Sequence, residues 1–223
     1  MSFGALFTGD QGQTIIDDTN SLCHVMATGI IDSSGSVTYL APIATSQPPL
    51  VWINLDGAGY LSYFRHTGSA GNWTGFTFNW NTYDLTAISR SGRYIATGTF
   101  PPAKAGWGLR VLDASSRVLA DTGYKLFRFY GGTQAWSYVG SGRVAQNYYY
   151  HFNANWPSTG FYFLASHFMR GIYRTVVNGV TTYNSCSLSI GHRSADKSQV
   201  FASLETISQT QPNSLQFPLI YGA

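Results

Sequence analysis

Residues 50–64 have the sequence LVWINLDGAGYLSYF, in which two apolar and aromatic runs flank the glycine-containing turn at residues 56–59. Glycine supplies the positive φ that tight turns require, so this stretch predicts a β-hairpin. Residues 75–80 alternate with period two, and Val176–Thr181 places Asn-Gly between β-branched residues, which is a strong hairpin signal. Further strands are predicted at residues 124–129, 148–152, 160–166, 171–177, 181–190 and 200–207.

The composition of the 223 residues favours the same class of fold. Charged residues make up 10%, against about 25% in ordinary globular domains, whereas aromatic residues reach 16%. Glu205 is the single glutamate, so one of the best helix formers is nearly absent while glycine and aromatic residues are abundant. The sequence therefore predicts an all-β, antiparallel protein made of two β-sandwich-like units.

A proline pair, Pro101-Pro102, interrupts the strand pattern and makes residues 99–106 the best linker candidate. The predicted units are residues 1–100 and 101–223, with a single domain as the alternative. Residues 107–129 also align with residues 3–25 at a constant offset of 104, which equates Gly4 with Gly108 and Asp17 with Asp121. This alignment predicts two related β units in which both aspartates end strands and bind backbone amides.

Charge and hydropathy exclude several classes of partner. The net charge is +3 and the basic residues are scattered, so nucleic acid is excluded because phosphate binding needs clustered positive charge. No stretch approaches the length of a membrane span. The first residues lack the basic region of a secretory signal, so we expect synthesis in a host cytoplasm.

Residues that could perform chemistry are sparse and scattered. Most aspartates lie beside Gly or Ser, as turn residues do, and the histidines form no metal-ligand motif. Glu205 and Asp196 are the least unfavourable carboxylate pair for a glycosidase. Cys23 and Cys186 are expected to be free thiols, with a disulfide as the alternative. We therefore predict no catalytic residue, no cofactor and no metal, and a protein that is not an enzyme.

The densest aromatic run is Tyr148-Tyr149-Tyr150-His151-Phe152, followed by Trp156. Strand neighbours point to opposite faces, so some of these rings are expected to point away from the core. We select Tyr148, Tyr150, His151 and Trp156 as the candidate interface. A sugar-binding platform and an ordinary sandwich core are the two alternatives.

The repeated motif carries a resemblance to a known group of proteins. Met1–Phe7 followed by Asp10–Asp17, and the second copy Trp107–Asp113 with Val118–Asp121, resemble the start of small structural proteins from the tail tip or baseplate of tailed bacteriophages. Those proteins begin with an aromatic-Gly strand and end the return strand on Asp, whereas here Ser116 replaces the turn glycine of the second copy.

This resemblance implies a virion component without chemistry of its own. It would be a homo-oligomer, with a trimer favoured by the symmetry of tail tips, and it would contact other tail proteins near the site of host adsorption. The competing hypothesis is a module that binds a host-surface glycan or receptor.

Overall fold

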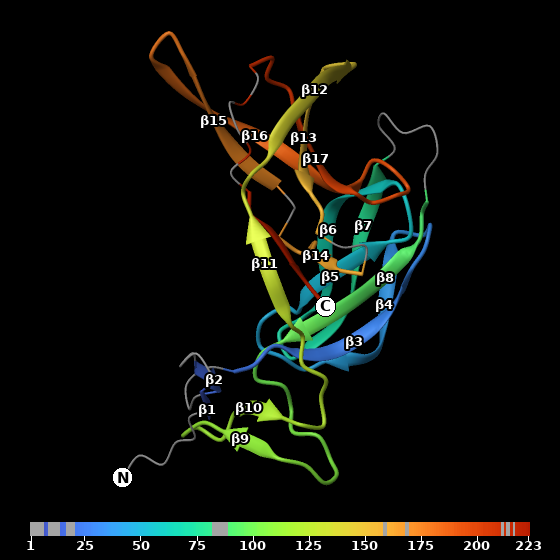
Figure 1. Cartoon of the computed structure of the whole chain (residues 1–223), viewed down its shortest axis with the longest axis vertical. Helices are drawn as coiled ribbons and strands as arrows, with labels where there is room; N and C mark the ends of the chain where they lie inside the picture. The colour runs from blue at the N-terminus through green and yellow to red at the C-terminus, as the bar shows by residue number, and fades with distance from the viewer. Residues whose placement is uncertain are drawn as a thin grey trace.

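The computed structural model describes residues 7–8, 14–16, 21–81, 89–157, 160–167, 170–210, 212, 215 and 217–223 (Figure 1). These residues contain strands, turns and irregular segments and no helix, so the predicted all-β, antiparallel fold is confirmed. In the described part of the chain two large sheets pack together as a sandwich, and two short hairpins lie apart from them.

The six-stranded sheet has the order β11-β18-β14-β5-β8-β3. Its strands are β3 (His24–Ile31), β5 (Leu50–Leu55), β8 (Gly92–Gly98), β11 (Phe129–Thr133), β14 (Tyr162–Leu164) and β18 (Leu219–Gly222).

The eight-stranded sheet has the order β12-β13-β17-β16-β6-β7-β4, with β15 also paired to β16. Its strands are β4 (Ser36–Ile43), β6 (Gly59–Ser69), β7 (Asn72–Asn81), β12 (Ser137–Val144), β13 (Asn147–Asn155), β15 (Arg170–Val177), β16 (Val180–His192) and β17 (Gln199–Thr206).

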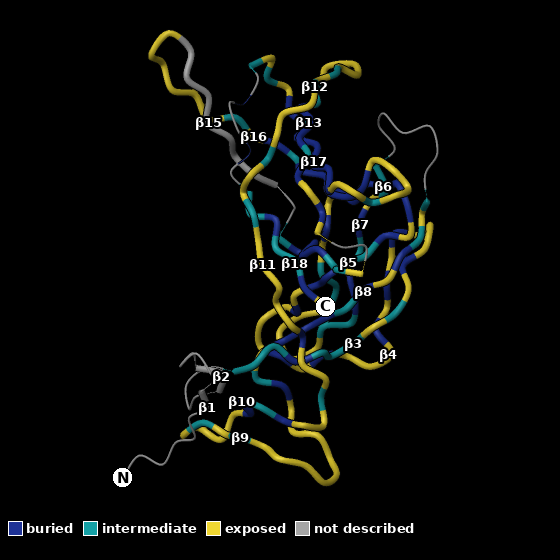
Figure 2. Tube along the Cα trace, viewed as in Figure 1, coloured by how far each residue is buried: buried dark blue, intermediate teal, exposed yellow. Residues whose placement is uncertain are grey.

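The core lies between the two large sheets, where alternate side chains of each strand meet. Ile53 from β5 and Phe163 from β14 join Phe76 from β7 and Leu188 from β16 in one fully buried cluster. Figure 2 shows this buried interior, and it shows exposed residues at the ends of the molecule, at the turn before β16 and the start of that strand, and around the short strands β9 and β10. Apolar burial at this scale is the dominant stabilising term of the fold.

The hairpin predicted at residues 50–64 does not form, although both of its strands do. β5 pairs with β8 and β14 in one sheet, whereas β6 pairs with β7 and β16 in the other. The turn at residues 56–59 therefore carries the chain from one sheet to the other. Alternation of burial is the same for both arrangements, so the local pattern did not distinguish a hairpin from a crossing between sheets.

The Asn-Gly hairpin is confirmed. Val177 pairs with Val180 across Asn178 (φ 49°) and Gly179 (φ 78°), the two positive φ values that a two-residue turn of this kind requires.

The predicted strand at residues 124–129 forms only at its end, where β11 begins at Phe129. Residues 124–128 are irregular apart from a bridge between His24 and Leu126. Phe127 is buried and stacks on Trp52, whereas Leu126 is exposed.

Residues 99–106 contain no strand, but the segments on either side of them share both large sheets. β14 pairs with β5, and β16 pairs with β6, so strands before and after the proline pair hydrogen-bond to each other. The two predicted units are therefore joined by strand pairing in both large sheets.

The sequence repeat corresponds to a repeated hairpin. β1 (Phe7–Thr8) pairs with β2 (Thr14–Ile16), and β9 (Arg110–Leu112) pairs with β10 (Val118–Asp121). Phe7 faces Ile16 as Val111 faces Ala120, and Thr8 faces Thr14 as Leu112 faces Val118, each position differing by 104. Beyond the hairpins, Phe127 donates its N–H to the carbonyl of Cys23, and these residues differ by the same offset. The two copies therefore share one register.

Candidate interaction surface

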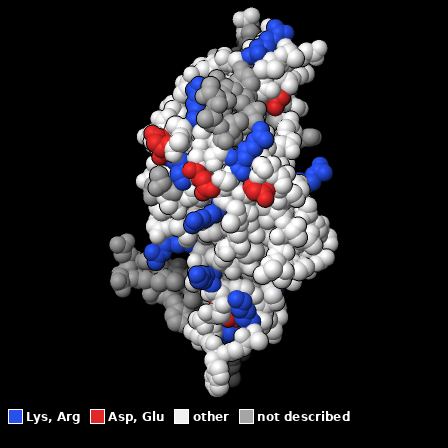
Figure 3. Space-filling model, turned by 90° about the vertical axis from the view of Figure 1, so that its right-hand side faces the viewer, with Lys and Arg blue, Asp and Glu red and all other residues white. Residues whose placement is uncertain are grey.

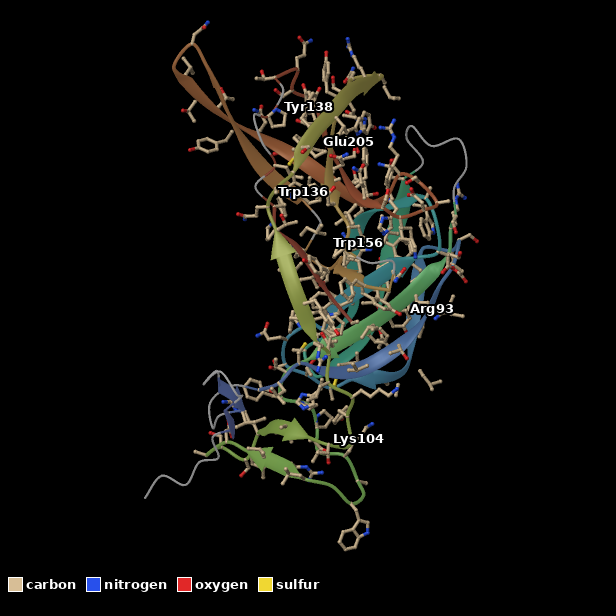
Figure 4. The ribbon with its side chains drawn as sticks, in the orientation of Figure 1. Arg93, Lys104, Trp136, Tyr138, Trp156 and Glu205 are labelled. Atoms are coloured by element: carbon tan, nitrogen blue, oxygen red, sulfur yellow. The ribbon has the colours of Figure 1, made fainter. Side chains whose placement is uncertain are left out.

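Of the predicted interface residues, Tyr148, Tyr150 and His151 lie on β13 and Trp156 directly follows it. Tyr150 (3% exposed), His151 (5%) and Trp156 (8%) are buried in the chain itself, and Tyr148 is half-buried against the core cluster. Trp156 packs edge-on against Phe163, His192 and Tyr221, and Figure 4 places it in the middle of the molecule. The burial of these side chains matches the core alternative. The exposed surface of the molecule consists of other residues.

Glu205 is held on the outer face of the eight-stranded sheet by its cross-strand neighbours. Its Oε1 accepts hydrogen bonds from Asn147 Nδ2 (2.6 Å) and Tyr149 Oη (3.1 Å). Ser187 stands opposite Glu205 on β16, and its hydroxyl donates to Tyr63 Oη at 3.3 Å. The result is a small polar patch with one exposed ring, that of Tyr63.

The other carboxylates near turns bind the backbone. Asp113 Oδ1 accepts the N–H groups of Ser115 and Arg117, and Asp196 Oδ1 accepts the N–H of Ser198. The backbone bond from Arg117 holds the pKa of the Asp113 carboxyl below its usual range, and the Ser194 hydroxyl, followed by the Ser198 N–H, does the same for Asp196. Asp196 and Glu205 share no hydrogen-bond partner, and no group of three metal-binding side chains occurs among the described residues. Among the residues that the structure describes, Asp113, Asp196 and Glu205 each bind their own separate partners.

Asp121 ends β10 and organises the neighbouring chain. It accepts the N–H groups of Gly123 (2.8 Å) and Lys104 (3.1 Å), the role that the sequence predicts for a strand-end aspartate, and it pairs with Arg110 Nε at 2.8 Å. The bond from Gly123 is the largest cause of its lowered pKa. At Gly108 an added Cβ would lie 2.6 Å from Thr122 Oγ1, so a larger residue would crowd this site. Gly4 and Asp17 lie outside the described residues.

The segment before β9 carries the most prominent exposed side chain. We call residues 102–109 the Trp107 loop, because Trp107 is fully exposed (105%) and Leu109 beside it is largely exposed. Leu109 exchanges backbone and side-chain hydrogen bonds with Thr122, and the Arg110 guanidinium donates to the carbonyl of Lys104. The loop backbone is therefore tied to β10 while its indole projects into solvent.

A hollow of about 250 Å³ opens on the outer face of the eight-stranded sheet. We call it the Phe201 pocket, and its lining comes from β12, β13, β17 and the turn after β16: Val139, Asn153, Arg193, Ser194, Gln199 and Phe201. The Arg193 guanidinium lies 5.4 Å from the centre of the Phe201 ring, which itself stacks on Tyr60. Asn153 Nδ2 donates to Gln199 Oε1 at 2.8 Å. Phe201 itself is buried (2% exposed), so the pocket presents the exposed Arg193 guanidinium and amide groups above a buried ring.

Sequence reasoning did not select Trp107 or the Phe201 pocket as functional. The sequence did contain a pattern that indicates exposure of Trp107. This residue lies between Gly106 and Gly108 and follows two prolines, so no neighbouring strand residue can cover it. The pocket had no such signal, since its residues come from four separate segments that meet only in the folded sheet.

Comparisons with known proteins returned no relationship. No family model, no curated protein and no solved structure matches the chain. Among the described residues, no helix has the length and apolar character that a membrane crossing would require, and both cysteines are free thiols.

Proposed function

We propose that this chain is a non-enzymatic structural component of a bacteriophage tail tip or baseplate, acting through contacts with copies of itself and with other tail proteins. The single observation that carries this proposal is the set of large apolar side chains left in solvent at one end of the molecule. Trp107, Leu109 and Leu112 project from β9 and the loop before it, with Leu126 also exposed. A fully exposed tryptophan is the kind of side chain that dominates protein interfaces.

The surface chemistry supports the same proposal. Figure 3 shows charged residues scattered over an otherwise uncharged face, and only two ion pairs occur among the described residues. Interface cores are depleted in charge and enriched in aromatic residues, so such a surface suits a subunit that becomes covered on assembly. The sequence resemblance supplies the particular assembly, the tail of a virion, with a trimer as the favoured state.

Mass spectrometry of purified virions tests the proposal. We expect peptides of this chain in intact particles, at a constant ratio to a known tail protein, and enriched when tails are separated from capsids. If the chain is absent from particles but abundant in the lysate, the proposal is wrong.

Glycan binding is the second candidate function, and the Glu205 patch favours it. A carboxylate held by Asn147 and Tyr149 beside the exposed ring of Tyr63 offers both hydrogen-bond acceptors and a stacking surface to a sugar. Binding of host-surface polysaccharide that is lost in Tyr63→Ala and retained in the remote variant Leu40→Ala would support this alternative.

We predict that the purified protein hydrolyses neither peptidoglycan nor capsular polysaccharide. A glycosidase needs two carboxyl groups about 5–10 Å apart, and Glu205 is bound to an amide and a phenol instead. Release of reducing sugar is the measurement. Turnover that disappears in Glu205→Gln would refute both this prediction and the non-enzymatic proposal.

A further inference from the structure

We propose that Trp107 of one copy inserts into the Phe201 pocket of a second copy, making a head-to-tail contact between subunits. This inference rests on the proposed structural function and names the contact through which the chain would self-associate. Both halves of the contact, the projecting indole and the hollow, are present on the same molecule.

The Trp107 loop is built to present its indole. The backbone N–H of Lys104 donates to the Asp121 carboxylate, and its ammonium group donates to the carbonyl of Gly123. Arg110 forms an ion pair with the same Asp121. A loop held in this way loses little entropy when it binds, which favours affinity. The Trp107 side chain is therefore already positioned for insertion, and we call it the knob.

The cations around the knob already have partners within the chain. Lys104 Nζ lies 4.4 Å from the centre of the Tyr124 ring in addition to its bond to Gly123, and Arg110 is paired with Asp121. A loop that docks on an anionic lipid surface would instead direct such cations toward the phosphates. The loop thus favours a protein partner over an anionic membrane.

The Phe201 pocket matches an indole in size and chemistry. A cavity of about 150 Å³ accommodates a benzene ring, so a hollow of about 250 Å³ has room for the bicyclic side chain. Arg193 is exposed and covers the buried Phe201 ring, so a ring from a second copy would meet the guanidinium as a cation–π partner. The amides of Asn153 and Gln199 provide oxygen acceptors near the pocket for the indole N–H, which needs a partner when buried.

The two halves lie at different places on the molecule, so the contact is heterologous. Figure 4 places Lys104, in the Trp107 loop, at the lower end, and Tyr138, next to the pocket residue Val139, near the upper end. Each copy therefore offers one knob and one pocket. Such contacts close into a ring when the rotation between copies permits it, and a three-fold ring is the favoured trimer.

Sedimentation of two complementary variants tests the contact. Trp107→Ala removes the knob, and Val139→Trp fills the pocket from its exposed rim on β12. We expect the wild-type chain to self-associate and each variant to lose at least about 30-fold in self-affinity, as for an interface hot spot. Mixed together, the two variants retain one intact knob and one intact pocket, so they should form a one-to-one dimer and nothing larger.

Leu40→Ala is the matched control, because Leu40 is equally exposed but lies on β4, away from both halves of the contact. It should sediment as the wild type does. The proposal is overturned if Trp107→Ala associates as the wild type does, if the two variants fail to complement, or if the wild-type chain is monomeric at all concentrations. Binding to phosphatidylglycerol vesicles that Trp107→Ala abolishes, without self-association, would also overturn it. None of these outcomes changes whether the chain is found in virions.

Discussion

At the scale of a single residue, the burial of Trp156 indicates that it belongs to the core and not to a contact surface. Its ring lies among Phe163, His192 and Tyr221, so truncation would leave a cavity between the sheets. We expect Trp156→Ala to lower the free energy of unfolding by about 3–5 kcal/mol, measured by urea denaturation. Trp107→Ala serves as the control, with a change within about 0.5 kcal/mol because its side chain is exposed. If Trp156→Ala is as stable as the wild type, Trp156 is not a core residue and the prediction is wrong.

His192 links stability to pH. It is buried, and its Nδ1 lies 2.8 Å from the carbonyl oxygen of Gln199, with the Trp156 and Phe163 rings around it. Burial lowers the pKa of His192 from 6.5 to about 4. Between these two values the unfolded chain binds a proton that the folded chain does not. The stabilisation is therefore complete above about pH 6.5 and is lost as the pH falls toward 4.

Denaturation at pH 7.5 and at pH 4.5 measures this linkage. A pKa shift of this size corresponds to about 3 kcal/mol, so the wild type should lose a sizeable part of its stability over this range. His192→Gln retains a side-chain donor but does not titrate, and its pH dependence should be smaller by that amount. The same pH dependence in both proteins would show that His192 is not the responsible group.

At the scale of an element, the β9–β10 hairpin contains a residue in an unfavourable conformation. Ser116 has φ 63°, in the left-handed region, where the first copy of the repeat has Gly12 at the matching sequence position. The N–H of Ser116 bonds to the carbonyl of Asp113, which fixes the turn. We expect Ser116→Gly to raise the free energy of unfolding by about 0.5–1 kcal/mol.

Thermal melting of two companion variants checks that this effect depends on φ. Ser116→Val should lower stability by about 1–2 kcal/mol, since β-branched residues are poorly accommodated at positive φ. Ser115→Gly, one residue earlier and outside the left-handed region, should not stabilise the protein. A gain in Ser115→Gly equal to that in Ser116→Gly would contradict the explanation.

Most of the strands that the sequence predicts do form, whereas the partners of these strands could not be predicted. The alternation around residues 75–80 and the Asn-Gly turn at Asn178 depend on neighbours in the chain, and both predictions match β7 and the β15–β16 hairpin. The transfer of residues 50–64 between sheets depends on β8, β14 and β16, which are distant in sequence. For the same reason the aromatic run on β13 could be located but its buried face could not.

The repeat is the exception among the long-range features. The offset of 104 predicted two related β units, and the structure shows the two hairpins paired in equivalent registers at that same offset. The Phe201 pocket lacks any such relation between its segments. Its prediction would require knowing that β12, β13 and β17 are adjacent.

At the scale of the whole molecule, the shared sheets determine how the chain should unfold. Each large sheet contains strands from before and after residues 99–106, and the two segments join where β5 pairs with β14 and where β6 pairs with β16. β5 would lose β14, and β16 would lose β6, leaving exposed edges on both fragments. We therefore expect one cooperative transition for the full chain, with calorimetric and van't Hoff enthalpies in a ratio of about one.

Cleavage of the chain distinguishes this expectation from the two-unit division. Fragments 1–100 and 101–223, expressed separately, should each lack the near-ultraviolet signal of packed aromatic side chains, because the shared core cluster draws Ile53 from one fragment and Phe163 from the other. Mixing them should restore that signal, since the strand pairs that join the sheets can then form between fragments. Two separable transitions in the full chain, or a fragment that folds alone, would instead make residues 99–106 a true linker between independent units.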